Sequence, residues 1–418
     1  MEYKRIRKDN YTFHLINTER FKLVDLVLIF TKKYDKNNVK YYSMLSKNIT
    51  STCKKYNTRS KLVNKCEWLY SMNIGANYET FGDLERFNVY SSFLNPMYVE
   101  DVKYEEIIDF FFEILNNPNV KDGKFNSKYF NIAKKDIETL IKSKKDNASM
   151  YATYKFNELM YKNTPKEYDV LPSLEELDEI DEYSLYSFYK KLFSEEYKLD
   201  VLFYGQIDES KVKYIESKIK DYKCNNIRYD VYPIIKRNTN VIEKVESMPF
   251  NQSKLYVGYD ISQLNDYELK YVIRVFNTIL GTMNDSLLFN IVREENSLCY
   301  TVNSYYSVYY KSLVIYAGIN RDNYEKTVQL IKDCIDKMSD IKLINKLINP
   351  AKKTINTFLN NYYDDSYAQL ENKYINEFDE KDDIELLREK LSEIKSEDIV
   401  NICSKLKLSV IYMMKGDN

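Results

Sequence analysis

The sequence predicts an α+β protein built from two similar halves. Its 418 residues exceed the roughly 100–200 of a single domain, and its 44% apolar and 30% charged residues are ordinary for a globular chain with large cores. Each half opens with strands and closes with a helix followed by a strand, and this order repeats after about two hundred residues. We therefore expect a first half at residues 1–222, a linker at 223–245 and a second half at 246–418.

The opening elements of the two halves correspond. Leu23–Phe30 is mostly apolar, which is typical of a buried strand, and Ser253–Tyr259 is its counterpart in the second half. A helix is expected after each of these strands, over Tyr41–Thr50 and over Asp266–Leu280. In the second of these helices, apolar residues recur at steps of three and four, as on the buried face of an amphipathic helix.

The closing elements correspond as well. Ser173–Glu176 has the pattern of a capping box, a side-chain arrangement that starts a helix, and Asp200–Tyr204 is the strand that follows. In the second half, Ser396–Ile402 is the expected helix and Leu408–Met414 the expected strand. Between the halves, Lys223–Val245 has weak periodicity and several turn-forming residues, so it is the expected linker.

Charge and composition exclude several classes of partner. The 62 lysines and arginines nearly balance the 63 aspartates and glutamates, so we expect neither nucleic acid nor an anionic membrane surface as a partner. The longest apolar strand, Leu26–Phe30, is far too short to cross a bilayer. The six cysteines are dispersed and form no CxxC pair, which fits a reducing compartment, and we expect a cytoplasmic protein.

The chain contains a single histidine, and this limits its chemistry more than any other feature. A catalytic zinc ion normally takes three protein ligands, mostly histidines together with a carboxylate or a cysteine. His14 stands alone in the strand-like segment Tyr11–Ile16, so we interpret it as a structural or surface residue. A nucleophile pair of His14 with a cysteine is disfavoured because no cysteine lies in an activating motif. We therefore expect no zinc centre in this chain.

The segment Leu280–Tyr300 is the most informative part of the sequence. It resembles the second-half signature of the pitrilysin/insulinase family, whose active members carry the inverted zinc motif HxxEH. The shared positions are Gly281, Ser286, Leu288, Phe289, Arg293, Glu294, Leu298 and Tyr300. The resemblance extends more weakly over nearly the whole chain. It implies that each half is a mostly antiparallel sheet with helices on one face, and that the two halves are arranged as a clamshell.

The resemblance breaks at the zinc motif. Neighbouring landmarks place Ser43–Lys47 where active members have HxxEH, two histidines on one helix face with a glutamate as the general base. Ser43 replaces the first histidine, Ser46 the base and Lys47 the second histidine, and an ammonium group repels a divalent cation. The family's further glutamate ligand should fall near Leu140, on the expected helix Phe130–Ile141. Glu138 is close to that position, but one carboxylate cannot hold zinc. This degenerate motif predicts that the chain binds no metal.

Arg293 and Tyr300 keep the other part of the family's chemistry. They match the second-half arginine and tyrosine that, in the family, bind substrate and stabilise the developing oxyanion, a role that needs no metal of its own. The two residues are seven positions apart, which is about two helical turns, so they share one helix face if the helix extends that far. The alternative interpretation is a surface arginine and one core tyrosine among 41.

Three functions are compatible with these residues. In the first, the chain is the non-catalytic subunit of a heterodimeric zinc peptidase: a sibling subunit carries HxxEH and the zinc ion, and this chain contributes Arg293 and Tyr300 to binding of the peptide substrate. In the second, the chain is an inert scaffold or peptide-binding protein of the same fold, and a homodimer is left open. The third is hydrolysis by Ser43 with Lys47, four residues apart on a helix, although nothing indicates an oxyanion hole or a desolvated lysine.

Overall fold

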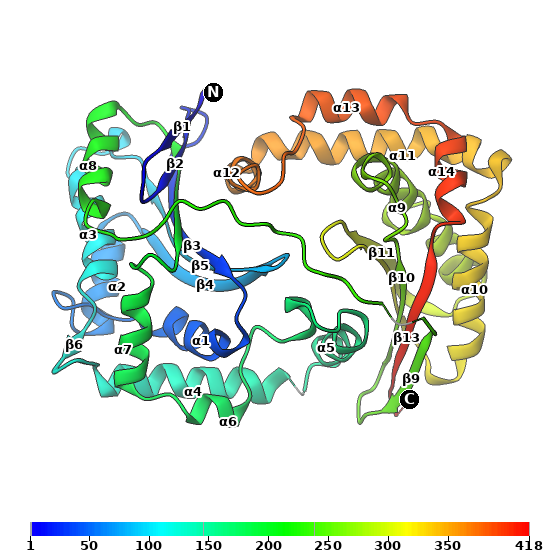
Figure 1. Ribbon diagram of the computed structural model, residues 1–418, viewed down its shortest axis with the longest axis horizontal. Coiled ribbons are helices and arrows are strands. Elements are labelled where there is room, and N and C mark those ends of the chain that lie inside the picture. The colour runs from blue at the N-terminus through cyan, green and yellow to red at the C-terminus, as the bar shows by residue number, and fades with distance from the viewer. Residues whose placement is uncertain (1, 145, 238, 418) are drawn as a thin grey trace. The chain divides into compact units, whose positions relative to one another are not determined.

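The computed structural model describes residues 2–144, 146–237 and 239–417. They form two compact units, and neither unit is a continuous stretch of chain. The first unit comprises Met1–Ser143, Asp169–Val231 and Asp365–Glu380; the second comprises Lys144–Tyr168, Tyr232–Asp364 and Lys381–Asn418. Each unit therefore contains one segment from the opposite part of the sequence (Figure 1). The predicted halves differ here: residues 144–168 fall in the predicted half 1–222 but pack in the second unit, and residues 365–380 fall in the predicted half 246–418 but pack in the first unit.

A six-stranded sheet forms the centre of the first unit, in the order β1-β2-β8-β3-β5-β4. Its strands are β1 (Glu2–Arg7), β2 (Thr12–Asn17), β3 (Leu23–Lys33), β4 (Asn73–Phe81), β5 (Leu84–Leu94) and β8 (Lys198–Gly205), and a separate short hairpin joins β6 (Val120–Lys121) to β7 (Lys124–Phe125). All neighbours in the sheet are antiparallel except β2 and β8, which confirms the prediction of a mostly antiparallel sheet. The expected strands Leu23–Phe30 and Asp200–Tyr204 lie in β3 and β8.

Alternation along these strands directs one set of side chains into a large apolar core, which includes Phe13, Leu28 and Val201. The helices that contribute to this core are α1 (Val39–Asn48), α2 (Arg59–Trp68), α3 (Tyr104–Asn116), α4 (Ser127–Lys144), α6 (Leu174–Asp178), α7 (Glu182–Lys191) and α8 (Glu209–Ile219). The predicted capping box is present at the start of α6. There the Ser173 hydroxyl accepts from the Glu176 amide at 3.1 Å, and the Glu176 carboxylate accepts from the Ser173 amide at 2.8 Å.

The opposite face of the first sheet carries buried polar groups. His14, Thr31, Arg86 and Asp200 alternate with the core residues of their strands, and all four are almost completely buried. The helix that covers them is α12 (Ser366–Ile375), which comes from a late part of the chain and lies against β2 and β8 (Figure 1). This unit thus has an apolar core on one side of its sheet and a polar, helix-covered face on the other.

The second unit contains a five-stranded sheet in the order β11-β12-β10-β13-β9. Its strands are β9 (Ile242–Ser247), β10 (Ser253–Asp260), β11 (Cys299–Ser307), β12 (Ser312–Ile319) and β13 (Lys407–Lys415). Only β13 and β9 are parallel neighbours in this sheet as described. The expected strands Ser253–Tyr259 and Leu408–Met414 lie in β10 and β13. β9 begins at Ile242, inside the predicted linker, because its backbone pairs with β13.

As in the first unit, several helices pack on one face of the sheet and form an apolar core with it. We call this the first face of each sheet and the opposite one its second face. Those that contribute to its core are α9 (Ile273–Asn277), α10 (Tyr324–Lys337), α11 (Ile341–Asn361), α13 (Ile384–Glu393) and α14 (Ser396–Cys403). The predicted helix Asp266–Leu280 is a helical run in which α9 is flanked by two π-helical turns, Glu268–Val272 and Thr278–Thr282. Among the residues that the structure describes, no helix is long and apolar enough to cross a bilayer.

α5 (Ala148–Met160) covers the second face of this sheet. Phe156 and Met160 pack against Tyr256 and Tyr412 in a separate apolar core. Gly258 on β10 permits this contact, because a Cβ atom there would stand 2.8 Å from the Met160 sulfur and 2.9 Å from the Phe156 ring. The sequence predicted helices on one face of each sheet; in addition, one helix lies on each second face, α12 in the first unit and α5 in the second.

Candidate functional site

The degenerate zinc motif lies on α1. Ser43 is buried, and its hydroxyl oxygen is 2.9 Å from two backbone carbonyl oxygens, those of Val39 and Val170. Ser46 donates to the carbonyl oxygen of Ser43 at 2.8 Å, and Lys47 is exposed. Both hydroxyl groups thus satisfy backbone carbonyls. The Ser43 contact ties α1 to the segment around Val170, at the residue predicted to replace the first histidine of HxxEH.

These side chains do not fit a zinc ion. Hydroxyl groups engaged with carbonyl oxygens and an exposed ammonium group supply none of the imidazole, thiolate or carboxylate donors that zinc prefers. Glu138 lies half-buried on α4, and its carboxylate is 3.9 Å from the Lys142 ammonium group. Across the described ranges of the chain, no three histidine, cysteine, aspartate or glutamate side chains lie close enough together to hold a metal ion.

Ser43 is not arranged as an activated nucleophile either. A serine–lysine pair needs a desolvated lysine that accepts the serine proton. The Ser43 hydroxyl instead donates to backbone carbonyl oxygens, and Lys47 is exposed to solvent. In the part of the chain that the structure describes, no hydrogen bond joins the two side chains. The geometry therefore disfavours hydrolysis by this pair.

His14 lies in a buried polar cluster on the second face of the first sheet. Its imidazole has no exposed surface; Nδ1 is 3.0 Å from the Tyr3 hydroxyl, and Nε2 is 3.0 Å from Oδ1 of Asp200. The Lys198 ammonium group also pairs with this carboxylate. Burial acts to raise the pKa of Asp200, but Lys198 and His14 outweigh it and hold that pKa below its ordinary value. His14 is thus a buried structural residue.

The cysteines provide no alternative nucleophile. All six are free thiols, and burial raises the pKa of Cys66 and Cys299 to about 11 and that of Cys224 and Cys334 to about 12. The nearby Arg293 charge opposes this rise at Cys299 without reversing it. Thiols with such pKa values are protonated at neutral pH, and the thiolate is the reactive form. The structure therefore agrees with the absence of an activating motif in the sequence.

The signature Leu280–Tyr300 divides into a buried and an exposed set. The buried positions are Gly281, Ser286, Leu288 and Leu298. Gly281 lies so close to β11 that a Cβ atom would stand 2.4 Å from the Ser304 hydroxyl oxygen. Ser286 precedes a helical turn, and its hydroxyl accepts from the Phe289 amide at 3.4 Å. Packing and capping account for this set without reference to a ligand.

Arg293 and Tyr300 belong to the exposed set. The Arg293 side chain is 44% exposed, its Nε is 3.6 Å from Oε1 of Glu294, and its guanidinium carbon is 4.8 Å from the centre of the Phe289 ring. Tyr300 is 74% exposed on β11, which is an edge strand of the second sheet. Both side chains present hydrogen-bond donors to solvent, where the carbonyl oxygen of another molecule can accept from them.

Arg293 and Tyr300 do not share a helix face, because the helix does not extend from one residue to the other. The π-helical segment that carries Arg293, Phe289–Glu295, ends before Tyr300 is reached. Ser297 has a left-handed backbone conformation, with φ of 53°, and its amide donates to the Arg293 carbonyl oxygen at 2.9 Å. Such a residue ends a helix. The chain then continues as β11 from Cys299, so Tyr300 lies on a strand.

Glu85 is a buried acidic residue that the sequence analysis missed. It lies on β5, and its carboxylate accepts from the Asp35 amide at 3.0 Å, from the Asn38 side chain at 2.7 Å and from the Tyr42 hydroxyl at 2.9 Å. Burial raises the pKa of Glu85 to about 7. Tyr42 and Asn38 lie at the start of α1, so this acid joins the sheet to the helix of the degenerate motif. The charged pair Glu85 and Arg86 inside a strand is the signal that could have marked it.

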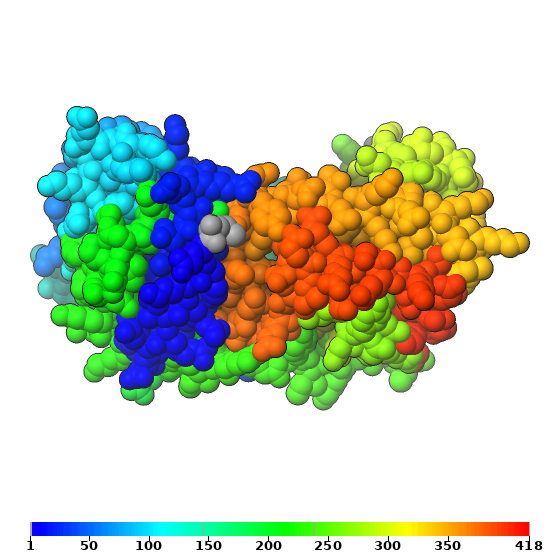
Figure 2. All heavy atoms as spheres, turned by 90° about the horizontal axis from the view of Figure 1, so that it is seen from above, coloured from blue at the N-terminus to red at the C-terminus, as the bar shows by residue number. Residues whose placement is uncertain are grey.

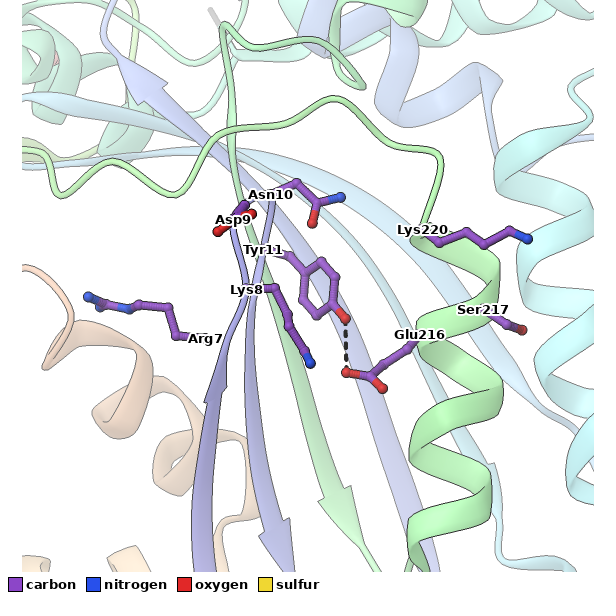
Figure 3. Close-up of a pocket in the computed structure, with 8 residues that line it drawn as sticks. All are labelled: Arg7, Lys8, Asp9, Asn10, Tyr11, Glu216, Ser217 and Lys220. Carbon is purple, nitrogen blue, oxygen red and sulfur yellow. Dashed lines mark hydrogen bonds between the residues drawn. The ribbon is translucent and has the colours of Figure 1, made fainter.

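An open hollow of about 520 Å³ lies in the first unit, between the turn that joins β1 to β2 and helix α8 (Figure 3). Its lining residues are Arg7, Lys8, Asp9, Asn10, Tyr11, Glu216, Ser217 and Lys220. The Tyr11 hydroxyl donates to Oε1 of Glu216 at 2.8 Å, as the dashed line in Figure 3 marks. This lining mixes cations and anions and includes neither the motif on α1 nor the signature residues, so the hollow is separate from the candidate site.

Comparison with known sequences connects this geometry to a family. Residues 179–355 match the family described as "Peptidase M16 inactive domain". A protein of Bacillus subtilis named "Probable inactive metalloprotease YmfF" is 24% identical over 413 residues, which cover 97% of this chain and 96% of that protein. The similarity to this relative therefore spans both units.

Two solved structures share the fold over almost the full length. A conserved protein from Enterococcus faecalis matches with a TM-score of 0.91 and 21% sequence identity, over 99% of each chain. The peptidase M16 inactive domain from Pseudomonas fluorescens matches with a TM-score of 0.79 and 15% identity, over 100% of this chain and 98% of that one. At these identities the likeness shows the fold alone.

Proposed function

Because the chain belongs to the M16 peptidase family, that of pitrilysin and insulinase, as a member without the zinc-binding motif, we propose that it is the non-catalytic subunit of a heterodimeric zinc peptidase. A sibling subunit then supplies HxxEH with its zinc ion, and this chain supplies Arg293 and Tyr300 to the bound peptide. The observation that carries the proposal is the division of the signature: these two side chains face solvent, whereas most of the other signature positions are buried.

The chemistry of the two side chains suits a peptide carbonyl that gains negative charge. A guanidinium group stays protonated and offers several N–H donors, and the Phe289 ring 4.8 Å away restricts its orientation. Tyr300 adds one hydroxyl donor from the edge strand β11, at a position where the pairing of β11 with β12 is irregular. Donors of this kind stabilise the oxyanion of the transition state, and loss of one typically lowers turnover roughly 100-fold.

Reconstitution tests the proposal. The untagged chain is combined with a family member from the same organism that carries HxxEH, and zinc content and peptide cleavage are measured for each chain alone and for the mixture. We expect cleavage by the mixture only, with zinc bound to the sibling. A sibling that cleaves equally well alone, or that never associates with this chain, contradicts the subunit role. A homodimer would appear in the same experiment as assembly of this chain without the sibling.

Arg293→Ala should lower kcat of the reconstituted pair roughly 100-fold and leave assembly intact, because it removes a charge that acts on the transition state. Tyr300→Phe removes one neutral donor and should have a smaller effect. Arg321→Ala is a matched control, since that side chain is also 44% exposed and its Nε is 3.7 Å from the adjacent Asp322. Equal turnover of the Arg293→Ala and Arg321→Ala pairs would remove the mechanistic role of Arg293.

The alternative function is an inert scaffold or peptide-binding protein of the same fold. One observation favours it: the hydroxyl groups of Ser43 and Ser46 bind backbone carbonyl oxygens, so the side chains of the degenerate motif stabilise α1. This function predicts that the chain associates with a partner or a peptide without any gain in cleavage. For both functions we infer a cytoplasmic location, where six free thiols remain reduced.

A further inference from the structure

The two helices that cover the second faces of the sheets are held by different interactions. α5 packs on the second sheet through apolar side chains, with Phe156 and Met160 buried against Val314 and Met414. Residues 365–380, which we name the strap, include α12 and pack on the polar face of the first sheet. In Figure 2 the strap (orange) borders the N-terminal strands (blue), which supply part of its ionic contacts.

Glu377 is the main ionic anchor of the strap. Its side chain is 1% exposed, and its carboxylate pairs with Arg5 at 2.7 Å and also with Arg7, both on β1. Burial acts to raise the pKa of Glu377, but the Arg5 hydrogen bond and nearby cations outweigh it and lower that pKa. A second pair joins Glu371 to Arg86 on β5 at 3.3 Å. Glu371 and Glu377 of the strap are therefore both paired with arginines of the sheet.

Hydrogen bonds from uncharged side chains of the strap add to this polar attachment. They join Ser366 to Asp25 at 2.7 Å, Tyr374 to Thr31 at 2.8 Å and Gln369 to Tyr204 at 3.3 Å. The buried apolar side chains of the strap are few: Leu370, Tyr374 and Phe378. On the same polar face, Oδ2 of Asp200 and Nε of Arg86 are buried without a hydrogen-bond partner in the described part of the chain. Such atoms regain hydration when a covering element leaves, which reduces the free energy of its release.

We propose that the strap is an electrostatic latch that can leave the first sheet, whereas α5 is a permanent apolar anchor on the second. Salt screens the arginine–carboxylate pairs, since Arg5 and Arg7 are 50% and 54% exposed, but it does not weaken apolar contacts such as those of α5. Release uncovers the polar face of the first sheet, including His14, and leaves the strap tethered to the second unit at Asp364 and Lys381. The latch does not depend on the proposed subunit function.

His14 reports directly on the latch because it is the single histidine of the chain. It has no exposed surface, and the Tyr374 ring of the strap lies edge-on to it with a centroid distance of 6.3 Å. Diethyl pyrocarbonate modifies an accessible neutral imidazole. The rate of His14 modification in the untagged full-length protein, followed by mass spectrometry, therefore measures how often the strap is released. Hydrogen exchange of strap and α5 peptides supplies a second measurement on the same sample.

Two changes should release the strap. At constant pH, raising NaCl from about 0.1 M to about 1 M shortens the Debye length from roughly 10 Å to roughly 3 Å and should speed His14 modification about fivefold or more. Glu377→Gln removes the main anchor, so it should speed modification about tenfold at the lower salt and lose most of the salt response. Exchange in α5 should stay unchanged in both cases. Glu209→Gln on α8, whose exposed Lys213 partner is 3.2 Å away, is the matched control and should behave as wild type.

Two results overturn the latch. One is a His14 modification rate that responds neither to salt nor to Glu377→Gln. The other is an equal rise of hydrogen exchange in the strap and in α5, because that reports unfolding of the whole molecule in place of release of the strap. If Glu377→Gln does not fold, Arg5→Gln tests the same ion pair from its half-exposed side, with the same expected direction and the same contradicting results.

Discussion

Glu85 combines complete burial with three hydrogen-bond donors, and the two effects oppose each other. Donors from Asp35, Asn38 and Tyr42 favour the ionised carboxylate, whereas burial favours the neutral acid. Burial dominates, and the pKa rises from 4.5 to about 7. Folding therefore takes up a proton between these pH values. The resulting stabilisation is complete below about pH 4.5 and is lost as the pH rises through about 7.

Glu85→Gln should flatten this pH dependence, because glutamine is neutral at every pH. Between about pH 4.5 and about pH 8, the free energy of unfolding of the wild type should fall by roughly 3 kcal/mol more than that of the variant. Urea unfolding at a series of pH values measures the difference. A constant offset from altered hydrogen bonds does not affect the slope, and Glu209→Gln should follow the wild type. Parallel curves for the wild type and Glu85→Gln would contradict the raised pKa.

At the residue scale, the sequence allows an argument about metal ligands but not about the environment of a buried acid. A single histidine, with Ser43, Ser46 and Lys47 at the motif, argues against a zinc site because ligand chemistry is a property of residue types. The raised pKa of Glu85 was not predictable in the same way, because a pKa depends on neighbours that are distant in the sequence. The Asp200 partner His14, for example, lies 186 positions away along the chain.

At the scale of single elements, Gly258 decides how closely α5 lies on the second sheet. Because a Cβ atom would stand 2.8 Å from the Met160 sulfur, Gly258→Ala should displace α5 from β10. We expect faster hydrogen exchange over Ala148–Met160 and a loss of roughly 1–3 kcal/mol in the free energy of unfolding, the usual effect of overpacking. Adding Met160→Ala opens space at the same contact, so the two changes should cost less together than the sum of the two alone. Additive costs would show that this contact does not limit the packing.

The elements expected from periodicity are present, but their partners were not predictable. Leu23–Phe30 and Ser253–Tyr259 have the composition of strands that are buried on both faces, and they lie in β3 and β10. Hydrophobic pattern reports that a face is buried and not which element buries it. The covering helices α12 and α5 come from distant parts of the chain. For a related reason, the turn at Ser297 was missed, because such helix ends are usually marked by glycine or asparagine.

At the scale of the whole molecule, the placement of α5 and the strap makes the two parts of the sequence depend on each other. Residues 365–380 cover the polar face of the first unit's sheet, and residues 144–168 complete the smaller apolar core of the second unit. We retain 1–222 and 246–418 as proposed homologous halves of a duplicated chain. The units that pack together differ from these proposed halves by the two segments 144–168 and 365–380.

Cutting the chain between Ile234 and Ile235 should therefore give two fragments that fold poorly alone. Ile234 is 80% exposed, so the cut itself removes little packing. Fragment 1–234 lacks the strap and exposes the apolar face of α5, and fragment 235–418 lacks α5 over its second sheet. Each alone should aggregate or show a broad transition, because unburied apolar surface favours association. Co-expressed, the fragments should associate and regain the cooperative unfolding of the intact chain. Sharp, independent transitions for the separate fragments would instead mean that α5 and the strap contribute little to stability, and that each part of the sequence carries its own complete folding information.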